Sequence, residues 1–238
     1  MDDAAASAPG APLHLTSGDG CAVALRAGLA QAGIPGTVAV WHDVLYEGPA
    51  RRPGWPDARV LAGRAAFLSD YTGGALSVAA VQATLEAQYR LLAAQPPAPL
   101  CLWFDACLFD TAMCAHVIAC LGDRGGIDGV DLVVIAEDSA VPDYHGLGQL
   151  APAAFAAAYP QRRPLTPALL AYARRLDAAF ADRDADVLAA LAAGVPAPLP
   201  AGPEACARAL AERPDPGTGL GLLERLTCDA LAAGPCRP

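Results

Sequence analysis

The chain has 238 residues, of which 54% are hydrophobic and 17% charged, a composition typical of a globular protein that buries a sizeable core. Its formal net charge is -9, and every cation is an arginine because the chain contains no lysine. This acidic balance disfavours nonspecific binding to nucleic acid or to an anionic membrane surface.

The first twelve residues carry acids where a secretory signal carries cations, and no apolar run follows them. They predict a disordered leader over residues 1–12. The eight cysteines contain no C-x-x-C pair, so we expect reduced thiols and a cytoplasmic location. The most apolar later stretch, residues 187–201, is interrupted by prolines and does not predict a membrane span.

Short apolar runs, each ended by polar or turn residues, predict four buried strands. They span residues 13–16, 37–41, 100–104 and 131–136. Helix-length segments lie between them at residues 21–32, 58–69, 77–94 and 109–121. Strand alternating with helix is typical of a parallel sheet covered by helices. The prediction is an α/β fold with a Rossmann-like parallel sheet of about four strands flanked by helices.

After His145 no further strand is predicted, and alanine-rich helical segments follow. These segments lie at residues 152–158, 167–181, 184–193, 204–212 and 220–232. We therefore expect an α/β ligand-binding domain over residues 13–150 and an α-helical C-terminal region over residues 151–238.

Polar residues follow each predicted strand. In an open parallel sheet the ligand crevice lies beyond the carboxyl ends of the strands, so these residues are expected to be neighbours in space. They are Ser17, Gly18 and Asp19 after the first strand, His42 and Asp43 after the second, Asp105, Cys107 and Asp110 after the third, and Glu137, Asp138 and His145 after the fourth.

The first of these turns has two interpretations. Gly18 and Gly20 allow a sharp turn that leaves free amides at the start of the next helix, where phosphate or carboxylate binds well. Alternatively, Asp19 caps that helix and no ligand is involved.

The second and third turns carry side chains suited to acid–base chemistry. His42 and Asp43 could form an acid/base pair or play structural roles. Asp105 and Asp110 bracket Cys107 and could hold a divalent cation or activate water, although no spacing demands a metal. A helix starting near Cys107 would lower the pKa of this thiol, whereas the two aspartates would raise it.

The loop from Val141 to Leu150 is the most distinctive, with a histidine ahead of two glycines. One interpretation is a lid over the crevice, with His145 reaching inward. The other is a connector between domains, with His145 exposed to solvent.

Four motifs occur in order along the chain: "HLTSGD" from His14, "WHDVLYEGP" from Trp41, "LWFDACLFDT" from Leu102 and "VPDYHGLGQL" from Val141. Together they resemble the bacterial family classed as domain of unknown function 1835, over most of the chain. The resemblance implies no reaction. It implies that the family's motif positions are held by His14, Asp19, Trp41, Asp43, Glu47, Asp110, His145, Gly146 and Gly148.

The chain departs from this family pattern at several positions. His42 replaces an arginine, Ser17 an asparagine and Tyr46 a histidine. Ala106 and Cys107 replace a His–Asp pair, so the resemblance implies an altered or inactive copy if that pair does the family's chemistry. Relatives continue beyond the counterpart of residues 219–225 with a winged-helix-like segment, and a complete DNA-reading module is not expected here.

Our leading prediction is a cytoplasmic hydrolase or transferase that binds a small anionic or nucleotide-like ligand at the strand-end crevice. The catalytic candidates are Asp43, Asp110 and His145, and the ligand-binding candidates are Ser17, Gly18, Asp19, His42, Glu47, Gly146 and Gly148. No metal ligand, cofactor or protein partner is assigned. The alternative is a regulatory or adaptor protein whose α/β domain senses a ligand while its helical tail contacts a protein or DNA.

Overall fold

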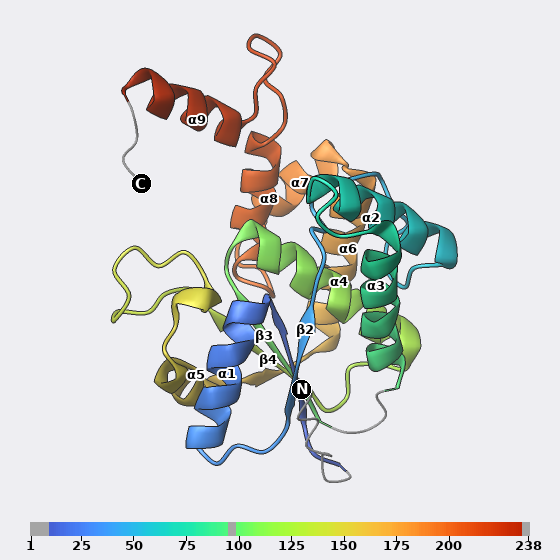
Figure 1. The fold of residues 1–238 in the computed structure, drawn as a ribbon, viewed down its shortest axis with the longest axis vertical. Helices are drawn as coiled ribbons and strands as arrows, with labels where there is room; N and C mark the ends of the chain where they lie inside the picture. The colour runs from blue at the N-terminus through green and yellow to red at the C-terminus, as the bar shows by residue number, and fades with distance from the viewer. Residues whose placement is uncertain (1–9, 95–98, 235–238) are drawn as a thin grey trace.

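The computed structural model describes residues 10–94 and 99–234. Residues 1–9 of the predicted leader lie outside the described residues, as does Cys236. The fold is α/β, with a five-stranded sheet flanked by helices (Figure 1). The strands are β1 (Leu13–Ser17), β2 (Thr37–Trp41), β3 (Leu100–Asp105), β4 (Val130–Ile135) and β5 (Arg163–Pro164).

The sheet has the strand order β2-β1-β3-β4-β5, and β1 to β4 are parallel. All four predicted strands are confirmed. The expectation of no strand after His145 is wrong, because β5 pairs antiparallel with β4 through two residues, Arg163 and Pro164. A two-residue strand has no periodicity to detect, and proline is tolerated in a sheet at an edge position such as this one.

Every helical segment predicted within the described residues contains a helix. The helices are α1 (Asp19–Gln31), α2 (Ala58–Tyr71), α3 (Val78–Ala93), α4 (Leu108–Arg124), α5 (Pro152–Ala158), α6 (Pro167–Asp182), α7 (Ala185–Ala192), α8 (Gly202–Ala211) and α9 (Leu222–Ala232). None of the helices in the described part of the chain has both the length and the apolarity needed to cross a membrane.

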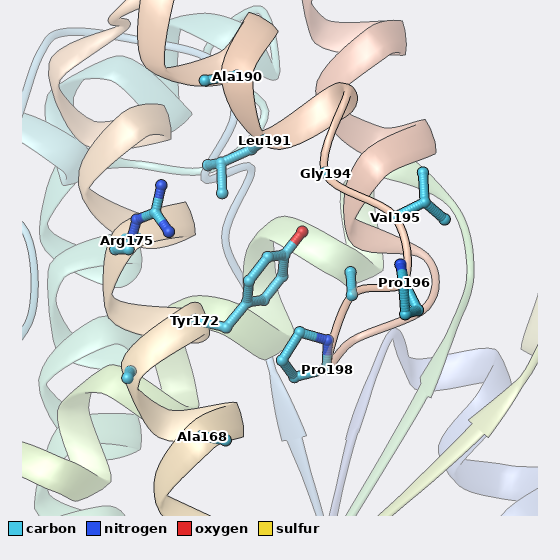
Figure 2. Close-up of a pocket in the computed structure, with 11 residues that line it drawn as sticks. Ala168, Tyr172, Arg175, Ala190, Leu191, Gly194, Val195, Pro196 and Pro198 are labelled. Atoms are coloured by element: carbon cyan, nitrogen blue, oxygen red, sulfur yellow. The ribbon is translucent and has the colours of Figure 1, made fainter.

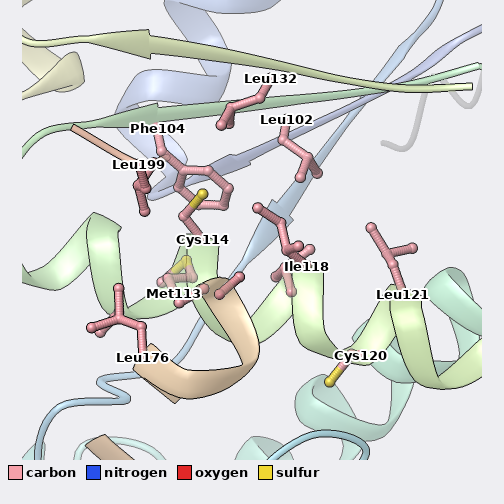
Figure 3. Close-up of a cluster of buried hydrophobic side chains, with 14 of the residues drawn as sticks. Leu102, Phe104, Met113, Cys114, Ile118, Cys120, Leu121, Leu132, Leu176 and Leu199 are labelled. Atoms are coloured by element: carbon pink, nitrogen blue, oxygen red, sulfur yellow. The ribbon is translucent and has the colours of Figure 1, made fainter. Parts of the chain in front are cut away.

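Helices cover both faces of the sheet because side chains alternate along each strand. Leu102 and Phe104 of β3 pack on one face with α4 and α6 in a cluster that includes Ile118 and Leu176 (Figure 3). Trp103 of β3 points to the other face and packs with α1 and α5. Asp105, two residues further along β3, therefore lies on the side of α1 and α5.

The helical C-terminal region shares the core of the sheet. Leu176 of α6 and Leu199 lie in the same cluster as the β3 side chains (Figure 3). Asp177 of α6 is fully buried and forms an ion pair with Arg51, while its Oδ1 lies 3.0 Å from Nδ1 of His116 on α4. A polar network therefore joins residues on both sides of position 150.

Helix α9 projects away from the rest of the molecule (Figure 1). It contains no buried residue, and Leu223, Leu226 and Leu231 are exposed. An exposed leucine face on a helix marks a possible contact surface.

Candidate functional site

The first turn at the carboxyl edge is built around Gly18. This residue is the N-cap of α1 and has φ 72°, a conformation that favours glycine. Gly18, and not Asp19, occupies the cap position, and no side chain caps the helix. Asp19 stands in the first turn of α1, where its carboxylate is stabilised by the positive end of the helix dipole.

Asp19 and His42 meet across the ends of β1 and β2. Nε2 of His42 lies 3.2 Å and 3.3 Å from the two carboxylate oxygens of Asp19. The backbone N–H of His42 donates to Oε1 of Gln88 at 2.5 Å, and Nε2 of Gln88 donates to the carbonyl of His42 at 3.2 Å. Asp19 thus orients an imidazole that is 43% exposed, an arrangement suited to a general base.

Asp43 faces away from this pair and is buried. It forms an ion pair with Arg64 of α2, and Arg64 also donates to the carbonyls of Val44 and Glu47 at 2.8 Å and 2.6 Å. Adjacent residues at the end of a strand point in opposite directions, so His42 and Asp43 do not contact each other through their side chains. Asp43 holds the turn after β2 in place.

Glu47 is half-buried in that turn, beside the hydroxyl of Tyr46. Burial and the charge of Glu47 raise the pKa of Tyr46. Tyr46 is therefore a neutral hydrogen-bonding group at this edge. Arg64 donates to the backbone carbonyl of Glu47, so the Glu47 carboxylate is left for other polar contacts.

Asp105, Cys107 and Asp110 form a compact cluster between β3 and α4. Oδ2 of Asp110 accepts the backbone N–H of Asp105 at 2.8 Å, and Oδ1 of Asp105 accepts that of Cys107 at 2.6 Å. A ligand atom from each of the three side chains lies within 4.8 Å of the other two. Within the described part of the chain this is the one group of such side chains able to hold a metal ion.

The carboxyl group of Asp110 is tuned toward neutral pH. Burial and the neighbouring Asp105 raise its pKa from 3.8 to about 7, although hydrogen bonds from the hydroxyl of Ser17 and the backbone of Asp105 oppose the rise. Ionising Asp110 in this buried position beside another acid is unfavourable, so Asp110 keeps its proton to a higher pH. Near pH 7, Asp110 is therefore poised to give up a proton.

Cys107 caps α4, with its sulfur accepting the backbone N–H of Asp110 at 3.4 Å. Desolvation and the neighbouring Asp105 nevertheless raise the pKa of the Cys107 thiol to about 12. Burial first and the acids second outweigh the helix terminus, and the thiol stays protonated. A nucleophilic role for Cys107 is not supported by this environment.

We expect iodoacetamide at pH 8 to modify Cys228, exposed on α9, about tenfold faster than Cys107, although both side chains reach the surface. Peptide mapping by mass spectrometry measures the two rates separately. Asp105→Asn should accelerate modification of Cys107 by removing the adjacent charge. Equal rates at the two cysteines in the wild-type chain would contradict the assignment of a protonated thiol.

The loop after β4 covers the acidic cluster through Gly146. A Cβ atom at Gly146 would lie 2.8 Å from Oδ2 of Asp105, so the backbone approaches this carboxylate closely. Leu147 and Leu150 anchor the loop in the core beneath α1 and α5. The side chain of His145 is exposed to solvent, and its backbone N–H donates to Oε1 of Gln149 at 2.5 Å. The loop passes over Asp105 at Gly146, but His145 does not reach inward.

Gly146→Ala is expected to destabilise the chain by about 1–3 kcal/mol, because the added methyl group displaces either the loop or the buried carboxylate of Asp105. Thermal unfolding and proteolysis of the loop at residues 136–150 measure the effect. Gly148→Ala is the matched control, since nothing lies within 4 Å of a Cβ atom at Gly148. Similar losses in both variants would show that the contact with Asp105 is unimportant.

Neither of two surface cavities formed by described residues is lined by Ser17, Asp19, Asp105 or Asp110. The first, of about 420 Å³, lies between α6, α7 and residues 194–198, where Tyr172 and Leu191 point into the space (Figure 2). The second, of about 640 Å³, lies between the turn at residues 49–53 and α2. The acidic cluster instead lies beside the loop that passes over Asp105 at Gly146.

No protein-family model, curated protein or solved structure matches the chain. Of the candidates from the sequence, the structure brings together Ser17 with Asp110, Asp19 with His42, and Gly146 with Asp105. Asp43 lies with Arg64. The side chain of His145 is exposed, and nothing lies within 4 Å of a Cβ atom at Gly148.

Gln88 is the important addition to the residues predicted from the sequence, and Asp105, named there as a strand-end acid but not as a catalytic or ligand-binding candidate, is part of the candidate site. Asp105 lies beside Asp110, donates its backbone N–H to that carboxylate and raises the pKa of Asp110. Gln88, on α3, holds the backbone of His42 from 46 residues away. No pattern within one sequence indicates such a long-range pairing.

Proposed function

We propose that the chain is a hydrolase or transferase acting on a small anionic, nucleotide-like ligand at the carboxyl edge of a Rossmann-like sheet. The observation that carries this proposal is the buried Asp105–Asp110 pair. The hydroxyl of Ser17 is hydrogen-bonded to Asp110, and the backbone at Gly146 lies close to Asp105. Burying two acids against each other destabilises a fold, and perturbed carboxyl pairs of this kind are typical of catalytic sites.

The side chains divide the chemistry between them. Asp110 gives its proton to the leaving group, and His42, oriented by Asp19, accepts a proton from the attacking water or hydroxyl group. The turn at Gly18 and the first amides of α1 receive the anionic part of the ligand. In this scheme Asp43 positions the turn after β2 through Arg64, and His145 lies on the covering loop.

The same proposal assigns the chain to the bacterial family classed as domain of unknown function 1835 and to the cytoplasm. Support for the family comes from where the motifs lie: "HLTSGD", "WHDVLYEGP" and "LWFDACLFDT" each run off the carboxyl end of a parallel strand, and "VPDYHGLGQL" covers that edge. A functional site is expected where motifs that are far apart in the sequence meet at one edge of the sheet.

A thermal-shift screen with nucleotides and sugar phosphates tests this function. A ligand that binds the folded chain raises its melting temperature in proportion to the logarithm of ligand concentration. We expect Asp19→Ala and His42→Ala to abolish the shift. Asp128→Ala is the control, because Asp128 is exposed at the opposite end of the sheet, before β4. An equal loss in Asp128→Ala, or no shift with any compound, would contradict the proposal.

The second candidate function, a regulator whose helical tail contacts a partner, is favoured by one observation. Helix α9 buries none of its residues and exposes Leu223 and Leu226. Association that depends on concentration and is abolished by Leu226→Glu at an unchanged melting temperature would support this function. A chain that stays monomeric at every concentration in light scattering would favour the enzyme alone.

A further inference from the structure

Two fourteen-residue segments of this acidic chain, residues 51–64 and 162–175, each carry four arginines, and those of the first segment line a single cavity. Residues 51–64 carry four of the sixteen cations, and Asp57 is their one acid. The four are Arg51, Arg52, Arg59 and Arg64. Each of them lines the cavity of about 640 Å³ between the turn at residues 49–53 and α2, a volume in the range of small-molecule sites.

Two of these arginines form a fixed floor. Arg51 and Arg64 are buried and form ion pairs with Asp177 and Asp43, so their guanidinium groups are held in place. The Nε atom of Arg51 is buried and has no hydrogen-bond partner within the described residues. A buried donor without an acceptor is unfavourable, but this nitrogen is also shielded from the cavity, so contacts to a ligand fall to the exposed arginines.

The other two arginines are available to a ligand. Arg52 and Arg59 are exposed, and neither forms an ion pair with any described residue. Arg59 stands in the first turn of α2, where the helix dipole adds positive potential. Two free guanidinium groups beside one helix terminus match the several acceptor oxygens of a phosphate better than the two of a carboxylate.

The acids of the lining reduce this potential only in part. Oδ1 of Asp57 accepts the backbone N–H of Val60, so this carboxylate is engaged by the helix that it caps. Asp182, at the end of α6, is exposed and is the acid of the lining that would repel an anion. The cavity therefore selects a ligand with a strongly anionic group at the Arg52–Arg59 side.

We propose that this cavity binds a small organic phosphate, with Arg52 and Arg59 contacting the phosphate and the remaining volume holding the organic part. The site goes beyond the function proposed above, because it needs neither Asp110 nor His42. It is linked to that edge through Arg64, which lines the cavity and also holds Asp43 and the carbonyl of Glu47.

Isothermal titration calorimetry with ribose 5-phosphate tests this site. The Arg52→Gln/Arg59→Gln double variant is expected to bind it about tenfold more weakly or worse, since two charge-assisted hydrogen bonds are lost. Arg175→Gln is the matched control, because Arg175 is exposed and lines the other cavity. Unchanged affinity in the double variant, or an equal loss in Arg175→Gln, would overturn the proposal.

Asp182→Asn gives a change of opposite sign that loss of folding cannot imitate. Removing the repelling charge is expected to tighten binding of inorganic phosphate and ribose 5-phosphate, and weaker or unchanged binding would count against the site. Repeating the titrations in the Asp19→Ala background separates the two proposals. An effect of Arg52→Gln/Arg59→Gln that persists there belongs to the arginine cavity, and one that disappears belongs to the edge of the sheet.

Discussion

Asp177→Ala is expected to lower the free energy of unfolding by about 3–5 kcal/mol, one of the largest losses for any single substitution in this chain. In the wild-type chain Asp177 accepts from the guanidinium of Arg51, and its Oδ2 accepts the backbone N–H of Gly54 at 2.7 Å. The substitution leaves both donors buried without their acceptor. It also removes the partner of Nδ1 of His116. Removing one member of a buried charge network costs far more than the net value of the pair, because the remaining charge is desolvated and uncompensated.

Urea denaturation of the wild-type chain and of Asp182→Ala provides the comparison, because Asp182 lies on the same helix but is exposed. A loss confined to Asp177→Ala fits the network, whereas a change within about 0.5 kcal/mol would mean that Asp177 contributes no more than a surface residue. The pH dependence has a definite sign. Burial works to raise the pKa of Asp177, but His116 and Arg51 hold it below its usual value. The stabilisation is therefore present above about pH 4 and is lost as the pH falls below it.

This network also shows the limit of what the sequence predicts about the fold. Apolar runs and helical spacing are local properties, and they predict four strands and the flanking helices. Arg51 and Asp177 lie 126 residues apart, and nothing near either residue identifies its partner. Tyr89, whose hydroxyl lies 2.6 Å from Nε2 of His116, is a regular member of an apolar helical stripe in the sequence. Buried polar pairing is decided by the tertiary fold, so the sequence alone does not reveal it.

For the candidate site as well, the sequence predicts which residues lie in one region but not which side chains pair. The rule that parallel strands end at one edge predicts that Ser17, Asp19, His42 and Asp110 share a region, and the pairs formed by these residues agree with it. The rule does not predict the direction of each side chain. His42 and Asp43 are adjacent, yet one turns toward α1 and the other toward α2. The position of a loop is also decided by its anchors, and Leu147 and Leu150 fix Gly146 over Asp105 while His145 stays outside.

Burial of the acidic pair places stability and function in opposition, and Asp110→Asn separates the two. The pKa of Asp110 is about 7 in the folded chain, compared with an ordinary value of 3.8. Between these values the folded chain keeps a proton that the unfolded chain has lost, so the free energy of unfolding falls as the pH rises from about 4 to 7. Asparagine carries no such charge. We expect Asp110→Asn to be more stable than the wild-type chain by roughly 2–4 kcal/mol at pH 8 and equally stable near pH 4.

The same substitution is expected to reduce turnover of a ligand found by the thermal-shift screen by about 10²–10⁴-fold, because the amide cannot supply a proton to the leaving group. Urea denaturation at pH 4, 6 and 8 measures the stability, and steady-state kinetics measures the turnover. Asp131→Asn is the control, because Asp131 lies on β4 in a partly exposed ion pair with Arg162. If Asp110→Asn gains stability at pH 8 while losing activity, Asp110 is an acid retained for chemistry. Substituting a residue retained for stability would lower both stability and activity. A variant that is less stable at every pH would instead make the carboxylate a structural anchor of the β3–α4 turn through the N–H of Asp105.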